Sequence, residues 1–241
     1  MYKKDYTFQV LVHGTPVREH PHQGLVYIEG RTDSNFTLRV QNNTSERVLA
    51  VITVDGLSVM NGRQGSYDSG GYVIGPHSSV NIPGWRLDND AVARFFFANY
   101  EQSYAAQMDR PTNIGVIGCA IFREMTFSPP VTYKIPYAEP PYGEPPHTRG
   151  DEYPALEGST ESFMPNIGTG FGDRTKHHVT EVNFRRQTGP SHTFEIFYDD
   201  RNGLTAKGVN LKPQVAILKP VAFPKEEENQ GCSPPPGWRQ Q

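Results

Sequence analysis

The stretch Val48-Leu-Ala-Val-Ile-Thr-Val54 decides the fold, together with the Asp55-Gly56 pair that follows it. Its seven residues carry no charge and are rich in β-branched side chains, which favours a strand buried on both faces. Asp-Gly is a turn signal, so we expect the strand to end at Val54. The pattern therefore predicts a core strand, with Asp55 as a turn residue rather than a catalyst.

Segments before this strand alternate apolar and polar side chains, as strands with one wet face do. Residues 6–12 and 36–41 show this alternation, and residues 25–28 form a short apolar run that suits an edge strand. A segment of turn residues separates the second alternating segment from the core strand. We predict that residues 36–54 form an antiparallel hairpin.

The following region continues the β pattern. Turn signals recur roughly every 8 to 12 residues from residue 57 onward, which is typical of sandwiches and small barrels. Residues 113–122 form a second unbroken apolar strand, and Cys119 within it is predicted to be a small buried hydrophobe. Two fully apolar strands flanked by alternating ones imply a core between two layers. The predicted fold class is all-β, an antiparallel, jelly-roll-like two-layer β-sandwich over residues 1–127.

Proline-rich segments mark the later boundaries. Residues 128–165 contain nine prolines, a density that interrupts helices and sheets and predicts an extended linker or arm. Residues 214–241 are a second proline-rich segment, a tail that we expect to need a partner in order to adopt one structure. Cys232 lies in this tail, so we expect it to be exposed, with an intermolecular disulfide as an open alternative.

Residues 166–213 are predicted to be a second structured unit. The alternating segments 178–185 and 192–198 indicate a β-hairpin, and Asp200 is a candidate cap for a short helix that stops at Gly208. Whether this unit packs on the sandwich or stands apart is open at this point. The glycines of residues 168–172 lack the strand, helix and Lys-Ser/Thr context of a phosphate-binding loop, so we interpret them as a flexible turn.

The bulk composition excludes some classes of partner. The 241-residue chain has a net charge of −3, which gives no general attraction to nucleic acids or anionic membranes. Its first residues lack the apolar core of a signal peptide, and no run of about 18 apolar residues occurs. We therefore expect no nucleic-acid partner, no membrane partner and synthesis in the cytoplasm, with a virion as an open destination.

Candidate metal ligands and nucleophiles do not form a recognisable set in the sequence. His20-Pro-His22 and His177-His178 lack the three or four ligands at characteristic spacing that zinc needs. The oxygen-rich clusters at residues 33–35, 88–90 and 199–200 are as typical of turns as of Ca²⁺ sites, and no nucleophile elbow is present. We predict no metal, no cofactor and no catalytic residue, although paired acids from separated strands stay open.

One group of aromatic and polar residues is a candidate binding surface. An arginine beside tyrosine and tryptophan suits sugar stacking or protein contact. In the alternative interpretation, the tryptophan closes the end of the sandwich. The candidate binding residues are Tyr72, Trp85, Arg86 and Tyr104.

Short motifs within residues 36–210 resemble those of a group of bacterial and phage-associated β-rich proteins. The motifs are VDGL at 54–57, GYV at 71–73, GWR at 84–86, NIGVIG at 113–118, FRE at 122–124 and GTG at 168–170. The group has no assigned activity, so the resemblance transfers no catalytic residue.

These observations favour a non-enzymatic structural or protein-interaction module. The expectation is a decoration or attachment component of a virion or another large assembly, with other protein subunits as partners in a homo- or hetero-oligomer. It rests on the proline-rich arm, which suits a path across neighbouring subunits, and on the tail. The alternative is a carbohydrate-binding module or glycan-active enzyme that uses the region of Tyr72, Trp85 and Arg86.

Overall fold

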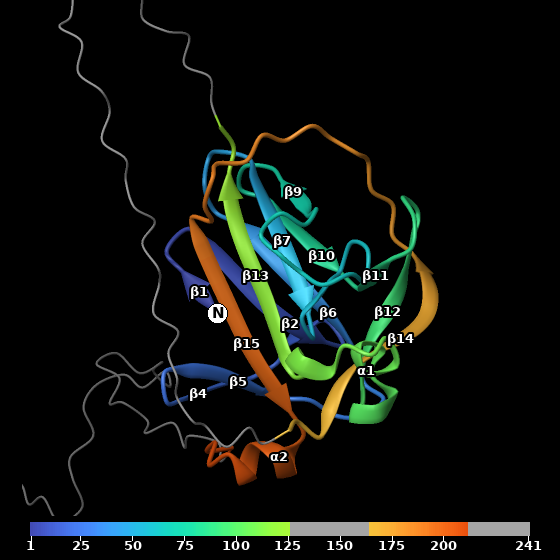
Figure 1. Ribbon diagram of the computed structural model, residues 1–241. Helices are drawn as coiled ribbons and strands as arrows, with labels where there is room; N and C mark the ends of the chain where they lie inside the picture. Colours follow the sequence, from blue (N-terminus) through green and yellow to red (C-terminus); the bar gives the residue numbers. More distant parts are fainter. Residues whose placement is uncertain (126–163, 212–241) are drawn as a thin grey trace, which may run out of the picture. The chain divides into compact units, whose positions relative to one another are not determined.

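The computed structural model describes residues 1–125 and 164–211, which form two β-sheets around one shared core (Figure 1). Ring contacts join the layers: the centroid of Phe8 in one sheet lies 5.8 Å from that of Phe194 in the other. The all-β sandwich predicted from the sequence is confirmed. The proline-rich segment up to residue 163, the tail 214–241 and Cys232 lie outside the described residues.

Sheet A is antiparallel throughout. β6 is its central strand and pairs with β2, β10 and β12, while β14 pairs with the other side of β12. Its members are β1 (Tyr2–Lys3), β2 (Tyr6–Val12), β3 (Thr15–Pro16), β6 (Asn35–Asn42), β10 (Ser79–Ile82), β11 (Gly84–Arg86), β12 (Ala91–Asn99) and β14 (Ile167–Lys176).

Sheet B runs in the order β4-β5-β15-β13-β7-β8, with β9 also paired to β7. Its β5–β15 pair is parallel and its other pairs are antiparallel. β5 therefore lies inside the sheet, and β4 occupies the edge that the sequence suggested for β5. The members are β4 (Glu19–His22), β5 (Leu25–Glu29), β7 (Val48–Val54), β8 (Leu57–Ser58), β9 (Tyr72–Ile74), β13 (Val116–Arg123) and β15 (His192–Asp199).

The core strand β7 is buried on both faces, as its sequence predicts. Alternate residues from Val48 to Val54 face the shared core, whereas Leu49 and Val51 pack with Ala120 and Phe122 in a second cluster on the other side of sheet B. Thr53 is the one residue of β7 that is only half-buried. An uncharged, largely aliphatic run is what such a two-sided environment requires.

The Asp55-Gly56 pair closes a two-residue hairpin between β7 and β8, in which Val54 pairs with Leu57. Asp55 has φ of 51° and Gly56 has φ of 75°. Positive φ at both central positions is the signature of the tight hairpin turn for which Asp-Gly is a preferred sequence. The predicted end of the core strand is confirmed.

The predicted hairpin over residues 36–54 is wrong, although both of its strands exist. β6 belongs to sheet A and β7 to sheet B, so the segment between them crosses from one layer to the other. Asn42 stabilises this crossing, because its side-chain amide donates to the carbonyl oxygens of Glu46 at 2.7 Å and Gly75 at 2.9 Å. Alternation correctly gave the buried face of β6, and the unbroken apolar run gave the burial of β7 on both faces, but neither pattern specifies the partner strand.

The predicted C-terminal hairpin is also wrong. β14 pairs with β12 in sheet A and β15 pairs with β13 in sheet B, so these strands complete the two sheets of the sandwich. The expected strand over residues 178–185 is absent: this part of the described chain is a connection that crosses between the layers. The glycines of residues 168–172 lie within β14 and do not form a turn.

The helices are short. Asp200 caps α2 as predicted, because its side chain accepts a hydrogen bond of 2.7 Å from the amide of Gly203, and Gly208 follows the helix with φ of 76°. The described residues contain the helices α1 (Tyr104–Gln107) and α2 (Arg201–Ala206) and the 3₁₀ turns η1 (Tyr100–Gln102) and η2 (Pro111–Asn113).

Candidate functional site

The four predicted binding residues fall into two separate groups. Trp85 and Tyr104 are in ring contact, with centroids 5.0 Å apart. Tyr72 and Arg86 are joined by a hydrogen bond of 2.8 Å from the guanidinium Nη2 to the phenol oxygen. The neighbours Trp85 and Arg86 are separated in this way because successive side chains of strand β11 point to opposite faces.

Trp85 is a core residue. Its side chain is 2% exposed, and its indole Nε1 donates to the carbonyl oxygen of Gly170 at 3.1 Å. Its ring also meets that of Phe95 edge-on, with centroids 5.2 Å apart. The expectation that Trp85 offers a sugar-stacking face is therefore corrected, because the ring is covered by the protein itself.

Arg86 links β11 to β9 and to the crossing connection. Its Nη1 donates to the carbonyl oxygen of His177 at 2.6 Å, and its guanidinium lies over the Tyr72 ring, 5.5 Å from the centroid. Burial raises the pKa of the Tyr72 phenol, and Arg86 opposes that rise. Burial lowers the pKa of His177, and the charge of Arg86 lowers it further. His177 therefore favours its neutral form and accepts a hydrogen bond from Arg86.

Tyr72 and Arg86 line a cleft of about 690 Å³, which we call the arginine cleft. One wall is the loop before β9, another is the crossing connection between β14 and β15, and β7 supplies part of the floor. Its charged and aromatic lining consists of Arg47, Asp68, Tyr72, Arg86, Glu181, Phe184 and Arg186.

The three arginines of the cleft differ in their partners. Arg47 pairs with Glu124, with Nε 2.9 Å from Oε2, and Arg186 pairs with Asp68 at 3.0 Å. Within residues 1–125 and 164–211, Arg86 forms no ion pair, and its acceptors are the neutral groups of Tyr72, His177 and the Asp88 backbone. Arg86 is thus a half-buried cation whose charge is not neutralised by a carboxylate of the described chain.

The comparisons with known proteins found no matching family model, no matching curated protein and no matching solved structure. The geometry of the described residues is therefore the basis for the functional argument.

A second polar cluster surrounds Asp55, which is 1% exposed. One carboxylate oxygen accepts hydrogen bonds from the amide of Gly115 at 3.0 Å and the hydroxyl of Tyr198 at 2.6 Å. The other accepts from the amide of Thr169 at 2.7 Å, and the hydroxyls of Thr169 and Tyr198 are 2.7 Å apart. These donors lie on β14, β15 and the segment before β13, so Asp55 joins both sheets.

Burial raises the pKa of the Asp55 carboxyl to about 6, against the opposing effect of the hydrogen bonds from Tyr198, Thr169 and Gly115. Burial and the neighbouring Asp55 likewise raise the pKa of the Tyr198 phenol. A carboxyl with a raised pKa is often catalytic, but this one is closed to solvent and both its oxygens are occupied. The interpretation of Asp55 as a structural turn residue is thus supported, and its role extends to joining the sheets.

Other candidate groups have structural surroundings. Cys119 is buried, as predicted, and burial raises the pKa of its thiol, which disfavours the nucleophilic thiolate. No group of three or more His, Cys, Asp or Glu side chains suited to a metal ion occurs in residues 1–125 and 164–211. In the same part of the chain, no helix is long and apolar enough to cross a membrane.

Sequence reasoning missed Arg47, Arg186 and Phe184 as parts of the cleft. Each comes from a connection rather than from a strand, so no periodicity marks it. The assembly of the cleft depends on the crossing connection between β14 and β15, which the sequence pattern presented as a strand. The sequence does show that these arginines are present, but it does not show that residues so far apart along the chain lie in one cleft.

Proposed function

We propose that the chain is a non-enzymatic protein-interaction module, and that the arginine cleft binds an acidic segment of a partner subunit. The proposal rests on the surroundings of Arg86. Its guanidinium is a half-buried cation in an open cleft, and its hydrogen bonds go to neutral acceptors. All four Nη hydrogens of Arg86 are already donated to these neutral acceptors. A partner carboxylate would therefore be attracted by the charge of Arg86, which no carboxylate of the described residues neutralises and which partial burial strengthens.

The surroundings of Arg86 are suited to binding without large rearrangement. Arg186 fixes the loop before β9 by donating to Asp68 at 3.0 Å and to the carbonyl oxygen of Ser69 at 3.3 Å. Apolar side chains, including the 53% exposed Val182, provide contact area beside the charge. A charged anchor within a partly apolar surface is a usual composition for a protein interface.

A role as a component of a larger assembly is part of the proposal. A virion is the assembly that the sequence resemblance suggests, and the proline-rich segments offer lengths of chain that suit contact with neighbouring subunits. The rival function, glycan binding at Tyr72, Trp85 and Arg86, has weaker support because Trp85 and Tyr72 are 2% and 6% exposed.

Site-specific photo-cross-linking tests the location of the interface. A photoreactive phenylalanine analogue replaces Val182 at the cleft or, as the control, Met108 at the end of α1, where the native side chains are 53% and 45% exposed. Both chains are produced at native level in the source organism. We expect a protein adduct from position 182 alone, with the cross-linked partner peptide rich in Asp or Glu.

Equal adducts from both positions, or a position-182 adduct with a partner peptide lacking acidic residues, would contradict the proposal. So would the absence of any adduct at position 182 while the chain remains folded, as judged by its thermal unfolding transition.

A further inference from the structure

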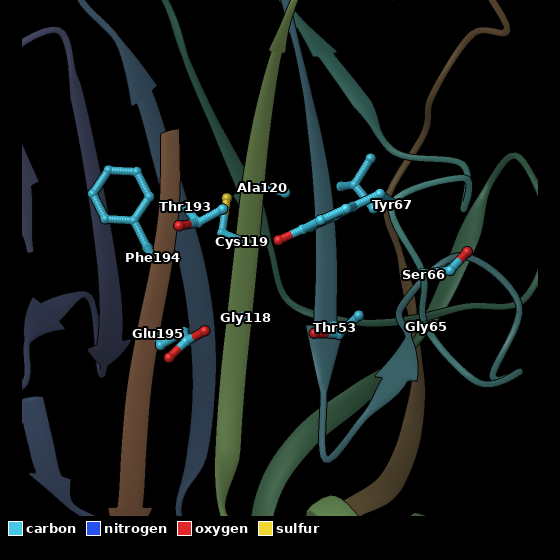
Figure 2. A pocket seen from close by; sticks show the side chains of 11 residues that line it. Thr53, Gly65, Ser66, Tyr67, Gly118, Cys119, Ala120, Thr193, Phe194 and Glu195 are labelled. Atoms are coloured by element: carbon cyan, nitrogen blue, oxygen red, sulfur yellow. The ribbon is translucent and has the colours of Figure 1, made fainter. Parts of the chain in front are cut away.

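A second recess lies on the outer face of sheet B, on the side remote from the shared core (Figure 2). It has a volume of about 360 Å³ and lies across strands β7, β13 and β15. The loop after β8 closes one side. We call it the Tyr67 groove; the residues that matter to its chemistry are Thr53, Tyr67, Gly118, Ala120, Thr193 and Glu195.

Strand register gives the groove its form. Gly118 pairs with Thr53 on one side and Glu195 on the other, and two residues further along β13, Ala120 pairs with Val51 and Thr193. The middle strand thus contributes the smallest side chains and the outer strands contribute larger ones. Because neighbouring strands are about 4.8 Å apart, the two walls are separated by roughly 10 Å at the backbone. The result is a trough that runs along β13.

The glycine in the floor leaves open space above the sheet. Gly84 must be a glycine, because a Cβ atom added there would overlap the carbonyl oxygen of Ala93. An added Cβ at Gly118, by contrast, would meet no backbone atom within 4 Å; it would lie 2.7 Å from the Thr53 hydroxyl, which would have to shift, and Gly118 does not have a positive φ. A strand glycine without a backbone reason marks a place where a ligand can approach closely.

Tyr67 supplies an aromatic surface beside this floor. Figure 2 shows its side chain reaching across β7 with the hydroxyl toward β13, and the residue is 58% exposed. Its ring contacts Phe122 edge-on, with centroids 6.1 Å apart, and its carbonyl oxygen accepts a hydrogen bond from Arg186. The ring is therefore held in place while much of it is open to a ligand.

The walls offer both acceptors and donors. The Glu195 carboxylate extends from β15 toward Gly118 and has no hydrogen bond or ion pair with any other described residue. The hydroxyl groups of Thr53, Tyr67 and Thr193 can both donate and accept hydrogen bonds. Glu195 is the one charged residue among the described residues that line the groove, so the groove disfavours anionic ligands.

We propose that the Tyr67 groove binds a neutral oligosaccharide. A pyranose ring presents a C–H face that stacks on an aromatic ring, and hydroxyl groups that both donate and accept hydrogen bonds. In the groove, Tyr67 provides the stacking surface, Glu195 accepts from sugar hydroxyls, and Gly118 gives a sugar ring access to the sheet. An open trough suits a linear chain of sugars. This site is distinct from the arginine cleft and does not depend on the function proposed for it.

A glycan array of neutral hexose and N-acetylhexosamine oligomers, with sialylated and sulfated glycans beside them, tests the proposal on the full chain. We expect binding to at least one neutral oligosaccharide, and Tyr67→Ala should reduce the affinity at least tenfold. Tyr2→Ala is the matched control, because Tyr2 is 69% exposed and lies outside the groove. Its affinity should equal that of the wild type.

Glu195→Gln and Gly118→Ala extend the test to the wall and the floor, and both are expected to weaken binding. Thermal unfolding of every variant separates a lost site from a lost fold; Tyr67 and Glu195 are exposed, so their variants should unfold as the wild type does. The proposal is overturned if no neutral glycan binds, if charged glycans are preferred, or if Tyr67→Ala binds like Tyr2→Ala.

Discussion

The polar clusters around Asp55 and Arg86 have opposite charges and similar surroundings. Asp55 is a carboxylate held by three neutral donors, and Arg86 is a cation held by neutral acceptors. Asp55 is 1% exposed and connects both sheets, whereas Arg86 is half-buried and lines an open cleft. Burial therefore separates their roles: a charged group closed to solvent serves the fold, whereas a partly exposed one is available to a partner.

The largest effect is expected from removing the closed charge. Asp55→Ala leaves the backbone amides of Gly115 and Thr169 without an acceptor in a dry site and takes from Tyr198 its charge-assisted acceptor, and each lost partner costs about 1 to 3 kcal/mol. We expect the free energy of unfolding, measured by urea denaturation at pH 5, to fall by about 3 to 5 kcal/mol. Asp173→Ala, at an exposed position of β14, is the control and should leave it unchanged. Equal stabilities of the two variants would contradict the structural role of Asp55.

The second prediction concerns pH. The raised pKa of Asp55 means that the folded state prefers the protonated carboxyl, so the stability from this group is complete below pH 3.8 and is lost as the pH rises through about 6. The corresponding change is about 3 kcal/mol. Urea denaturation of the wild type and Asp55→Asn between pH 4 and 7 isolates it. We expect the wild type to lose stability relative to the variant as the pH rises; a constant difference would disprove the raised pKa.

Removing the open charge should have a smaller effect on the fold. Arg86→Gln loses its hydrogen bonds to Tyr72 and His177, which should lower the free energy of unfolding by about 1 to 2 kcal/mol. It also removes the second cause of the low pKa of His177, so that pKa should rise in an NMR titration. Arg174→Gln is the control. If the pKa of His177 were unchanged in Arg86→Gln, the charge of Arg86 would not act on His177, which would contradict the contact described for the cleft.

The smallest effect is expected at an exposed ion pair. Arg174 and Asp88 lie 2.7 Å apart, with side chains that are 65% and 45% exposed, so solvent screens their attraction. Arg174→Gln should therefore leave the midpoint of thermal unfolding unchanged. A clearly lower unfolding midpoint would contradict the view that exposed charges contribute little to the stability of this protein.

The sequence predicts the strands of this fold better than their partners. The unbroken apolar run of β7 and the Asp-Gly turn were sufficient to place a core strand and its end. Alternation in residues 36–41 gave the buried face of β6, but nothing local indicates that β6 and β7 enter different sheets. The second predicted hairpin failed for a different reason: residues 178–185 alternate like a strand but form a connection, and β15 pairs with β13, which is distant in sequence.

The candidate site was predictable only in part. Tyr72 and Arg86 do meet, but Trp85 points to the core, because neighbouring residues of a strand face opposite sides. The donors to Asp55 could not be inferred, since Thr169 and Tyr198 lie far along the chain and are brought together by the completed sandwich. Arg47 and Arg186 lie in connections, whose paths depend on tertiary structure.

The most direct test of an acidic partner changes the charge at an exposed position of the arginine cleft. Val182→Glu and Val182→Lys alter the same exposed position at the cleft. Each chain is produced at native level in the source organism, and the sedimentation of the extracted protein measures the size of its complex. An acidic partner predicts that the wild type sediments as a complex larger than the 27.0 kDa chain. The Val182→Glu variant should then be released from the complex, because it repels the partner, and the Val182→Lys variant should be retained. A wild-type monomer, or equal behaviour of the two variants, would contradict the claim.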